Sequence, residues 1–154
     1  MPTSNLVLFD TNILVYCFDG ESPFNTQAII WREKSVNGEI NGVLSSQNIS
    51  EFTKVLLDPK QSRVPITSKV IAMEIAKYRN LQSSFSIIYP NSKTLDIFEE
   101  LVTNFPPKGT PQRIFDVFLV ATMLGNNISS ILTTNIKDFA SYPQIKAIDL
   151  AKTN

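Results

Sequence analysis

Short apolar runs alternate along the chain with longer segments of helical periodicity. The runs are too short for helices and predict strands at residues 6–9, 42–44, 85–89, 130–133 and 145–148. Apolar residues at helical spacing predict helices at residues 12–18, 22–37, 47–57, 68–81, 92–104 and 113–124. Ser92 is expected to cap the fifth helix, with Leu95 on its buried side.

This alternation of strand and helix predicts the α/β class. Mostly apolar strands are typical of a parallel sheet that helices cover on both faces. The chain contains no repeat, low-complexity tract or linker, so residues 1–154 are expected to form one domain. In such folds ligands bind beyond the carboxyl ends of the strands, and that edge is where chemistry is expected.

Asp116 lies on an apolar face of its predicted helix. It is the only charged residue between Arg113 and Lys137, and apolar residues follow it three, four and seven positions later. An acid in the first turn of a helix stabilises the helix dipole by about 0.3–1 kcal/mol. That effect explains a position near the helix start but not the choice of the apolar face, so a functional role is favoured.

Asp10 and Glu51 are isolated in the same way. Asp10 directly follows the first predicted strand, and Glu51 is the only charged residue between Glu39 and Lys54. Each also has a structural interpretation, because Asp10 can cap the following helix and Glu51 has capping-box spacing from Asn48. Taken alone, Asp10 is balanced between the two interpretations, and Glu51 is better explained by structure.

Asn135 and Asp138 follow the strand at residues 130–133. Taken singly, they are best explained as a turn or helix cap, since Asn and Asp side chains bond to local backbone. All these residues nevertheless fall near the same expected edge of the sheet. Carboxylates that meet in a partly dry pocket repel one another unless a cation holds them, and oxygen ligands suit Mg²⁺ or Mn²⁺. The pattern predicts metal-assisted hydrolysis of a phosphodiester.

Composition narrows the possible chemistry further. The chain has no histidine and one cysteine, which excludes His-based catalytic triads and zinc sites rich in His or Cys. Fourteen basic and fourteen acidic residues give no net charge, so any charged site is local. The lone cysteine and the absence of a signal-like or membrane-spanning segment predict a cytoplasmic protein with no membrane association.

Four sequence blocks together resemble the PIN domain, and in particular its VapC-like toxin branch. These are LFDTNILVY, SSQNISEF, IFDVFLVATMLGNNISSILTTNIKDF and the terminal hydrophobic strand, and the resemblance extends from Leu6 to about Leu150. It implies a three-layer α/β/α sandwich with a mainly parallel sheet. It also implies a ribonuclease that depends on Mg²⁺ or Mn²⁺, the toxin of a toxin–antitoxin pair.

The resemblance assigns roles by position. Asp10, Glu51 and Asp116 match the three principal acids, and Asp138 is the fourth candidate for catalysis and metal binding. The family's fourth acid usually stands where this chain has Asn135, which leaves open which of Asn135 and Asp138 serves that position. Supporting roles fall to four polar residues: Thr11, Asn12, Thr134 and Asn135.

The expected partners also follow mainly from the resemblance. It implies an RNA substrate, a small antitoxin protein that occludes the site, and a homodimer. Lys108 and Arg113 flank the approach to Asp116, and Lys137 lies beside Asp138, so these cations are weak candidates for binding substrate phosphate.

Two alternatives remain at this point. The first is a catalytically weak PIN-like module that binds nucleic acid or protein, which the missing acid at Asn135 would suggest. The second is a phosphatase similar to haloacid dehalogenases, whose nucleophilic Asp also ends a first strand. That family needs a second Asp at the position where this chain has Asn12, so the phosphatase ranks last.

Overall fold

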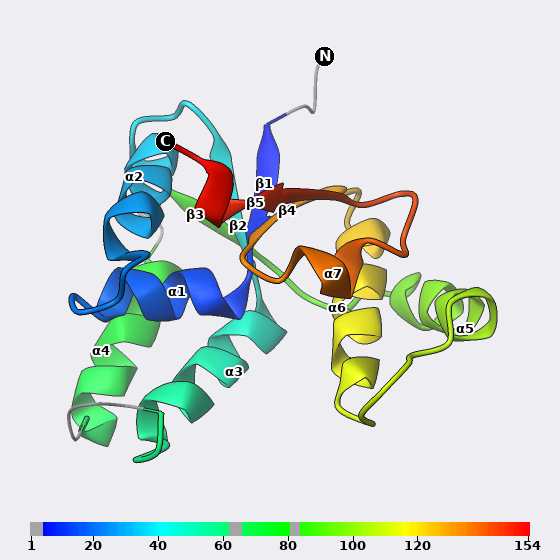
Figure 1. Ribbon diagram of the computed structural model, residues 1–154, viewed down its shortest axis with the longest axis horizontal. Helices are drawn as coiled ribbons and strands as arrows, with labels where there is room; N and C mark the ends of the chain where they lie inside the picture. The colour runs from blue at the N-terminus through cyan, green and yellow to red at the C-terminus, as the bar shows by residue number, and fades with distance from the viewer. Residues whose placement is uncertain (1–4, 62–65, 81–83) are drawn as a thin grey trace.

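A sheet of five parallel strands lies at the centre of the molecule, in the order β3-β2-β1-β4-β5 (Figure 1). The computed structural model describes residues 5–61, 66–80 and 84–154. The strands are β1 (Leu6–Phe9), β2 (Asn41–Ser45), β3 (Phe85–Ile88), β4 (Ser130–Thr133) and β5 (Lys146–Asp149). Every neighbouring pair is parallel, which confirms the predicted sheet.

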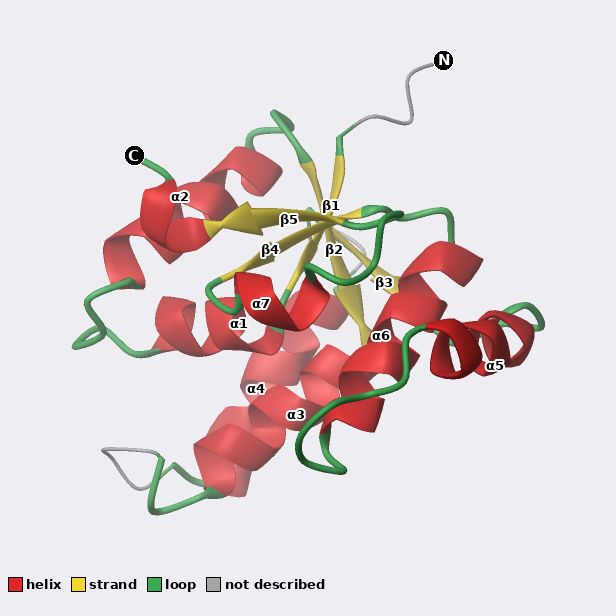
Figure 2. Ribbon diagram, turned by 45° about the vertical axis from the view of Figure 1, so that its right-hand side comes forward, coloured by secondary structure: helices red, strands yellow, loops and turns green. Residues whose placement is uncertain are grey.

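Helices cover both faces of this sheet. The described helices are α1 (Thr11–Phe18), α2 (Asn25–Val36), α3 (Ser46–Leu57), α4 (Ser68–Arg79), α5 (Thr94–Asn104), α6 (Arg113–Gly125) and α7 (Ile136–Phe139), followed by a 3₁₀ turn at Leu150–Lys152. Helices α1 to α4 lie on one side of the strands, and α5 and α6 lie on the other (Figures 1 and 2). The three-layer α/β/α sandwich is therefore confirmed.

The central strand β1 contributes to a hydrophobic core on each face. Val7 and Phe9 pack with residues of α1, α3 and α4, whereas Leu8 packs with residues of α5 and α6. Successive side chains of a strand point to opposite faces, so a run of apolar residues is required when both faces are covered. This is why the sequence around β1 shows no polar alternation until Asp10.

The strand register brings the ends of β1 and β4 together. Leu8 lies opposite Ile131 and Phe9 opposite Leu132, and the backbone N–H of Asp10 donates to the Leu132 carbonyl at 3.0 Å. Since all five strands are parallel, their carboxyl ends share one edge. Helices α1 and α3 begin at that edge, directly after β1 and β2.

The start of α5 differs from the prediction. The helix begins at Thr94, and its N-cap is Lys93, which makes no capping side-chain bond, so the predicted cap at Ser92 is wrong. Thr94 is fully buried, and its hydroxyl accepts a hydrogen bond from the backbone N–H of Asn91 at 2.8 Å. Leu95 is 67% exposed, so its predicted place on the buried side is also wrong. The predicted end of the preceding helix, Leu81, lies outside the described residues.

The short helix α7 was expected only as a turn, because four residues are too few to show helical periodicity. In the described part of the chain, no helix has the length and apolar character needed to cross a bilayer.

Candidate active site

Asp10 is held rigidly at the junction of β1 and α1. It is the N-cap of α1, and its Oδ1 accepts a hydrogen bond from the backbone N–H of Thr11 at 2.8 Å. Its Oδ2 accepts a hydrogen bond from the hydroxyl of Thr133, at the end of the adjacent strand β4, at 2.7 Å. Asp10 therefore does cap a helix, and the same bonds fix its carboxylate at the edge of the sheet.

Glu51 is oriented by a polar network and does not cap α3. The hydroxyl of Thr11 donates to Oε2 of Glu51 at 3.0 Å, and Nε2 of Gln47 donates to Oε1 at 2.7 Å. Nδ2 of Asn48 in turn donates to the Thr11 hydroxyl at 3.2 Å. The capping box of α3 is formed by Ser45 and Asn48, so the capping explanation for Glu51 is wrong.

Asp116 and Asp138 enter the site from α6 and α7. Asp116 lies in the first turn of α6, and Asp138 lies in the short helix α7 that follows β4. Nη1 of Arg113 lies 2.7 Å from Oδ1 of Asp138, so an ion pair links the start of α6 to α7.

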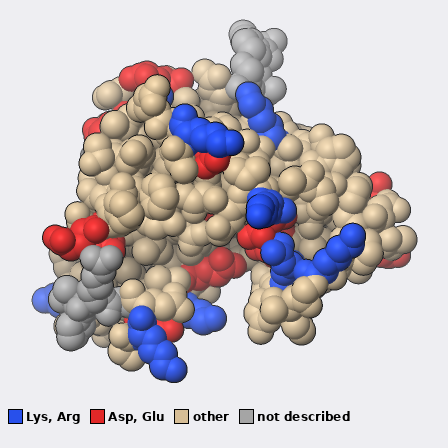
Figure 3. Space-filling view, viewed as in Figure 1, with Lys and Arg blue, Asp and Glu red and all other residues tan. Residues whose placement is uncertain are grey.

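The four carboxylates line one pocket of about 580 Å³, which contains Asp10, Glu51, Asp116 and Asp138. Figure 3 shows acidic side chains in a hollow between the two halves of the molecule, with basic side chains beside them. The convergence of the four predicted acids on one pocket follows from parallel strands and helix starts that share an edge.

Burial and mutual repulsion disturb the titration of two of these acids. Burial raises the pKa of Asp10 to about 6; hydrogen bonds from Thr133 and Thr11 oppose this shift, and the charges of Glu51 and Asp138 add to it. Burial also raises the pKa of Asp116 to about 6, and the charges of Asp138, Asp10 and Glu51 add to that shift. The four groups therefore interact electrostatically, and a cation among them would relieve the repulsion.

A second pocket of about 540 Å³ adjoins the first through Asp116 and Asp138. Its lining includes Lys108, Arg113 and Lys137, the three cations singled out in the sequence. A local basic surface thus lies directly beside the carboxylates, although the chain has no net charge.

The donor atoms of the acidic pocket suit a hard divalent cation. Carboxylate, amide and hydroxyl oxygens are available, and Mg²⁺ is commonly bound by one or two carboxylates with water completing its shell. Within the described ranges, no three Asp, Glu, Cys or His side chains are arranged to hold one ion together. Asp10 and Glu51 accept hydrogen bonds from protein donors, and Asp138 pairs with Arg113. The donor atoms therefore suit the cation, while three of the four carboxylates already have partners within the protein.

Comparison with known protein families decides the fold family. The family model of the PIN domain matches residues 7–144. This chain belongs to the PIN domain family. The match leaves the haloacid-dehalogenase alternative without support.

Solved structures of similar fold include a toxin–antitoxin complex and a toxin. The chain is similar to a toxin–antitoxin complex from Klebsiella pneumoniae, with 21% identity, 94% of this chain and 97% of the other covered, and a TM-score of 0.58. FitAcB from Neisseria gonorrhoeae shares 13% identity over 96% of this chain and 99% of its own, with a TM-score of 0.66. The sarcin–ricin loop cleaving toxin VapC20 of Mycobacterium tuberculosis is 9% identical to this chain. The match covers 88% of this chain and 95% of VapC20, with a TM-score of 0.62. No curated protein sequence is significantly similar to the chain.

The predicted supporting residues of this PIN domain separate into two groups. Thr11, Asn12 and Asn135 line the acidic pocket. Thr134 does not line it, and its hydroxyl instead shares a hydrogen bond with the Tyr16 hydroxyl at 3.2 Å.

Several residues that contact the site were not predicted, among them Thr133, Gln47 and Lys54. Thr133 bonds to Asp10, Gln47 bonds to Glu51, and Lys54 lines the acidic pocket. Thr133 could have been found from the sequence, because it is the last residue of a strand and the strand beside it ends next to Asp10. Gln47 lies four positions before Glu51, and Lys54 lies three positions after it. Residues at this spacing share one face of a helix, so the sequence also placed both beside Glu51.

Proposed function

We propose that this PIN domain is a ribonuclease that depends on Mg²⁺ or Mn²⁺ and hydrolyses phosphodiester bonds of RNA. The observation that carries the proposal is the convergence of four carboxylates from separate elements on one pocket. Such crowding costs stability, and two of the four have a pKa raised to about 6. A folded protein retains such a cluster when function requires it.

Asp10, Glu51, Asp116 and Asp138 would hold the cation, with Asn135 close by in the same pocket. A cation held there would supply Lewis-acid chemistry at a phosphoryl oxygen and would lower the pKa of water, which provides a nucleophile in a chain without histidine.

The remaining tasks fall to side chains of the protein. Thr133 and the Thr11 backbone hold Asp10 in place through one bond to each of its oxygens. Thr11 and Gln47 do the same for Glu51. Lys108 and Lys137 face the adjoining pocket, where they would bind phosphates next to the cleaved bond and fix the register of the strand.

Cleavage of a fluorescent single-stranded RNA tests this proposal. The wild type is expected to cut it with Mg²⁺ or Mn²⁺ and to stop when EDTA is added. Asp10→Asn and Asp116→Asn should abolish cutting, while Asp96→Asn, on the exposed surface of α5, should leave it unchanged. Cutting that persists in EDTA or in the Asp10→Asn variant would refute a metal-dependent mechanism.

We further propose that the protein is the toxin of a toxin–antitoxin pair and acts in the cytoplasm as a homodimer with a small antitoxin partner. Its support is the fold shared with toxins solved in complexes with antitoxins. Induced expression should arrest growth, and coexpression of a short neighbouring reading frame should restore it. If the wild-type protein cuts RNA but its expression does not affect growth, the toxin role is rejected and the nuclease proposal stands.

A catalytically weak binding module is the second candidate. It is favoured by Asn135 at the position of the usual fourth acid and by the ion pair that occupies Asp138. The two candidates differ in one result. A binding module keeps its biological effect when Asp10 or Asp116 becomes Asn, whereas a nuclease loses it.

A further inference from the structure

We propose that Phe115 is the platform on which an unpaired base of the RNA stacks beside the cleaved phosphate. This inference rests on the proposed function and specifies its substrate as single-stranded RNA. Phe115 precedes Asp116 in the first turn of α6, it lines the acidic pocket, and 58% of its surface is exposed. A large aromatic ring that remains open to solvent next to the carboxylates offers a face for a base.

The position of Phe115 is coupled to the acidic cluster. Nε2 of Gln47 donates to the Phe115 carbonyl at 2.9 Å and to Oε1 of Glu51 at 2.7 Å. One amide therefore bridges the wall that carries Glu51 and the wall that carries Phe115. These two bonds fix the backbone of Phe115 relative to Glu51. A stacking platform needs a fixed position if the stacked base is to bring its phosphate to the carboxylates.

The surroundings of Phe115 favour a base over an apolar protein segment. The same pocket presents the amides of Asn12, Gln112 and Asn135, which can pair with the polar edges of an unstacked base. Among the described residues, the other large apolar side chains that are exposed lie outside both pockets: Ile30, Val36, Leu57, Val70, Met73, Tyr89 and Leu95. A single ring in a polar pocket does not provide the apolar surface that anchors a protein partner.

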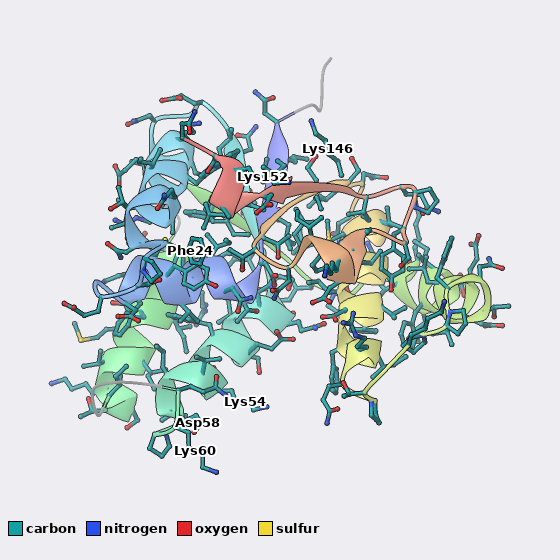
Figure 4. All side chains as sticks on the ribbon, viewed as in Figure 1. Phe24, Lys54, Asp58, Lys60, Lys146 and Lys152 are labelled. Carbon is teal, nitrogen blue, oxygen red and sulfur yellow. The ribbon has the colours of Figure 1, made fainter. Side chains whose placement is uncertain are left out.

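Cations line both adjoining pockets and give the backbone of a strand a path across the site. In Figure 4 the side chain of Lys54 extends from α3 on the side that faces α6, and Lys54 lines the acidic pocket. Lys108 and Lys137 line the adjoining pocket beyond Asp116. A strand that follows these cations crosses the acidic pocket that Phe115 lines, and only an unpaired base can stack on the ring.

Fluorescence anisotropy with defined oligonucleotides tests the inference. The probes are a fluorescein-labelled 12-residue oligo(A), an abasic strand of the same length, and a 12-base-pair RNA duplex. Ca²⁺ replaces Mn²⁺ to limit cutting, because it takes the same oxygen ligands. The variants are Phe115→Ala and Phe115→Trp, with Tyr89→Ala as the matched control, since Tyr89 is also 58% exposed but lines neither pocket.

Phe115→Ala is expected to weaken binding of oligo(A) by roughly 5- to 150-fold, the range for loss of one base–aromatic stack. It should change binding of the abasic strand less than about twofold, because only phosphate contacts remain there. Phe115→Trp should bind oligo(A) at least as tightly as the wild type, Tyr89→Ala should match the wild type, and the duplex should bind more weakly than oligo(A).

Unchanged oligo(A) binding by Phe115→Ala would overturn the inference and leave the exposed ring to a protein partner, while the nuclease proposal would stand. An equal loss on the abasic strand would also overturn it, because it would assign Phe115 a packing role. If the wild type binds none of the probes and cuts no RNA, the proposed function and the inference fail together.

Discussion

Nη1 of Arg113 lies 2.7 Å from Oδ1 of Asp138, so a cation from α6 is paired with a carboxylate of the candidate active site. The charge of Arg113 also lowers the pKa of Asp116, against the larger effects that raise it. One arginine thus offsets part of the repulsion among the four acids. A divalent ion that binds Asp138 has to compete with this arginine.

Replacing Arg113 by Gln is expected to tighten Mn²⁺ binding, because Asp138 is released and a competing positive charge is lost. The gain should not exceed about fivefold, since partly exposed ion pairs contribute about 0.2–1 kcal/mol. Calorimetric titration measures it. Arg32→Gln, which removes the Arg32–Glu33 pair on α2, is the control and should have no effect. Weaker Mn²⁺ binding by Arg113→Gln would show that the ion pair does not compete.

Thr133→Val should destabilise the metal-free protein at pH 7.5. The Thr133 hydroxyl is buried, it donates to Asp10 at 2.7 Å, and it accepts from the backbone N–H of Asn135 at 2.9 Å. Loss of a hydrogen bond to a charged group lowers the free energy of unfolding by about 1.5–3 kcal/mol. Urea unfolding measures this, and Thr133→Ser should retain most of the stability. Equal stability of Thr133→Val and wild type would contradict the role given to Thr133.

Asp116→Asn is expected to raise the melting temperature in EDTA at pH 7, because it removes a carboxylate whose ionisation is opposed by burial and by three neighbouring acids. Relief of about 1 kcal/mol raises Tm by about 2–4 °C in a domain of this size. Asp96→Asn, in the first turn of α5, is the matched control. It should lower Tm slightly through the helix dipole alone. A lower Tm for Asp116→Asn would mean that its charge stabilises the fold.

Stability of the metal-free protein should decrease as pH rises from about 4 to about 6. The pKa of Asp10 and of Asp116 is raised in the folded state from 3.8 to about 6, so the folded protein binds more protons than the unfolded chain in this window. Stability therefore falls with increasing pH and levels off above it. Melting curves in EDTA test this, and the decrease should be smaller in Asp116→Asn. A rise in stability between about pH 4 and about pH 6 would contradict the raised pKa values of Asp10 and Asp116.

The sequence predicted the sheet, its edge and the acids that meet there, because these depend on local pattern. Lone charges on apolar elements identified Asp10 and Asp116, and parallel strands placed them at one edge. The sequence predicted Thr134 as the supporting threonine, but the register between β1 and β4 gives that place to Thr133. β4 pairs with β1 so that Thr133 reaches Asp10, while the next residue, Thr134, bonds to Tyr16.

Other features depend on packing between distant elements. Leu95 fits an apolar stripe in the sequence, yet it is exposed, while the polar Thr94 beside it is buried. The ion pair of Arg113 with Asp138 and the exposure of Phe115 follow from how α6 lies against α7 and α3. Sequence periodicity describes one element at a time, so it does not contain these relationships.

Calorimetric titration of the metal-free protein with Mn²⁺ at pH 7 tests most directly whether the four carboxylates form a metal site. Saturable binding is expected for the wild type and for Asp96→Asn, and strongly weakened binding for Asp10→Asn and Asp116→Asn. Absence of saturable binding by the wild type, or equal binding by all four proteins, would contradict a metal site formed by these carboxylates.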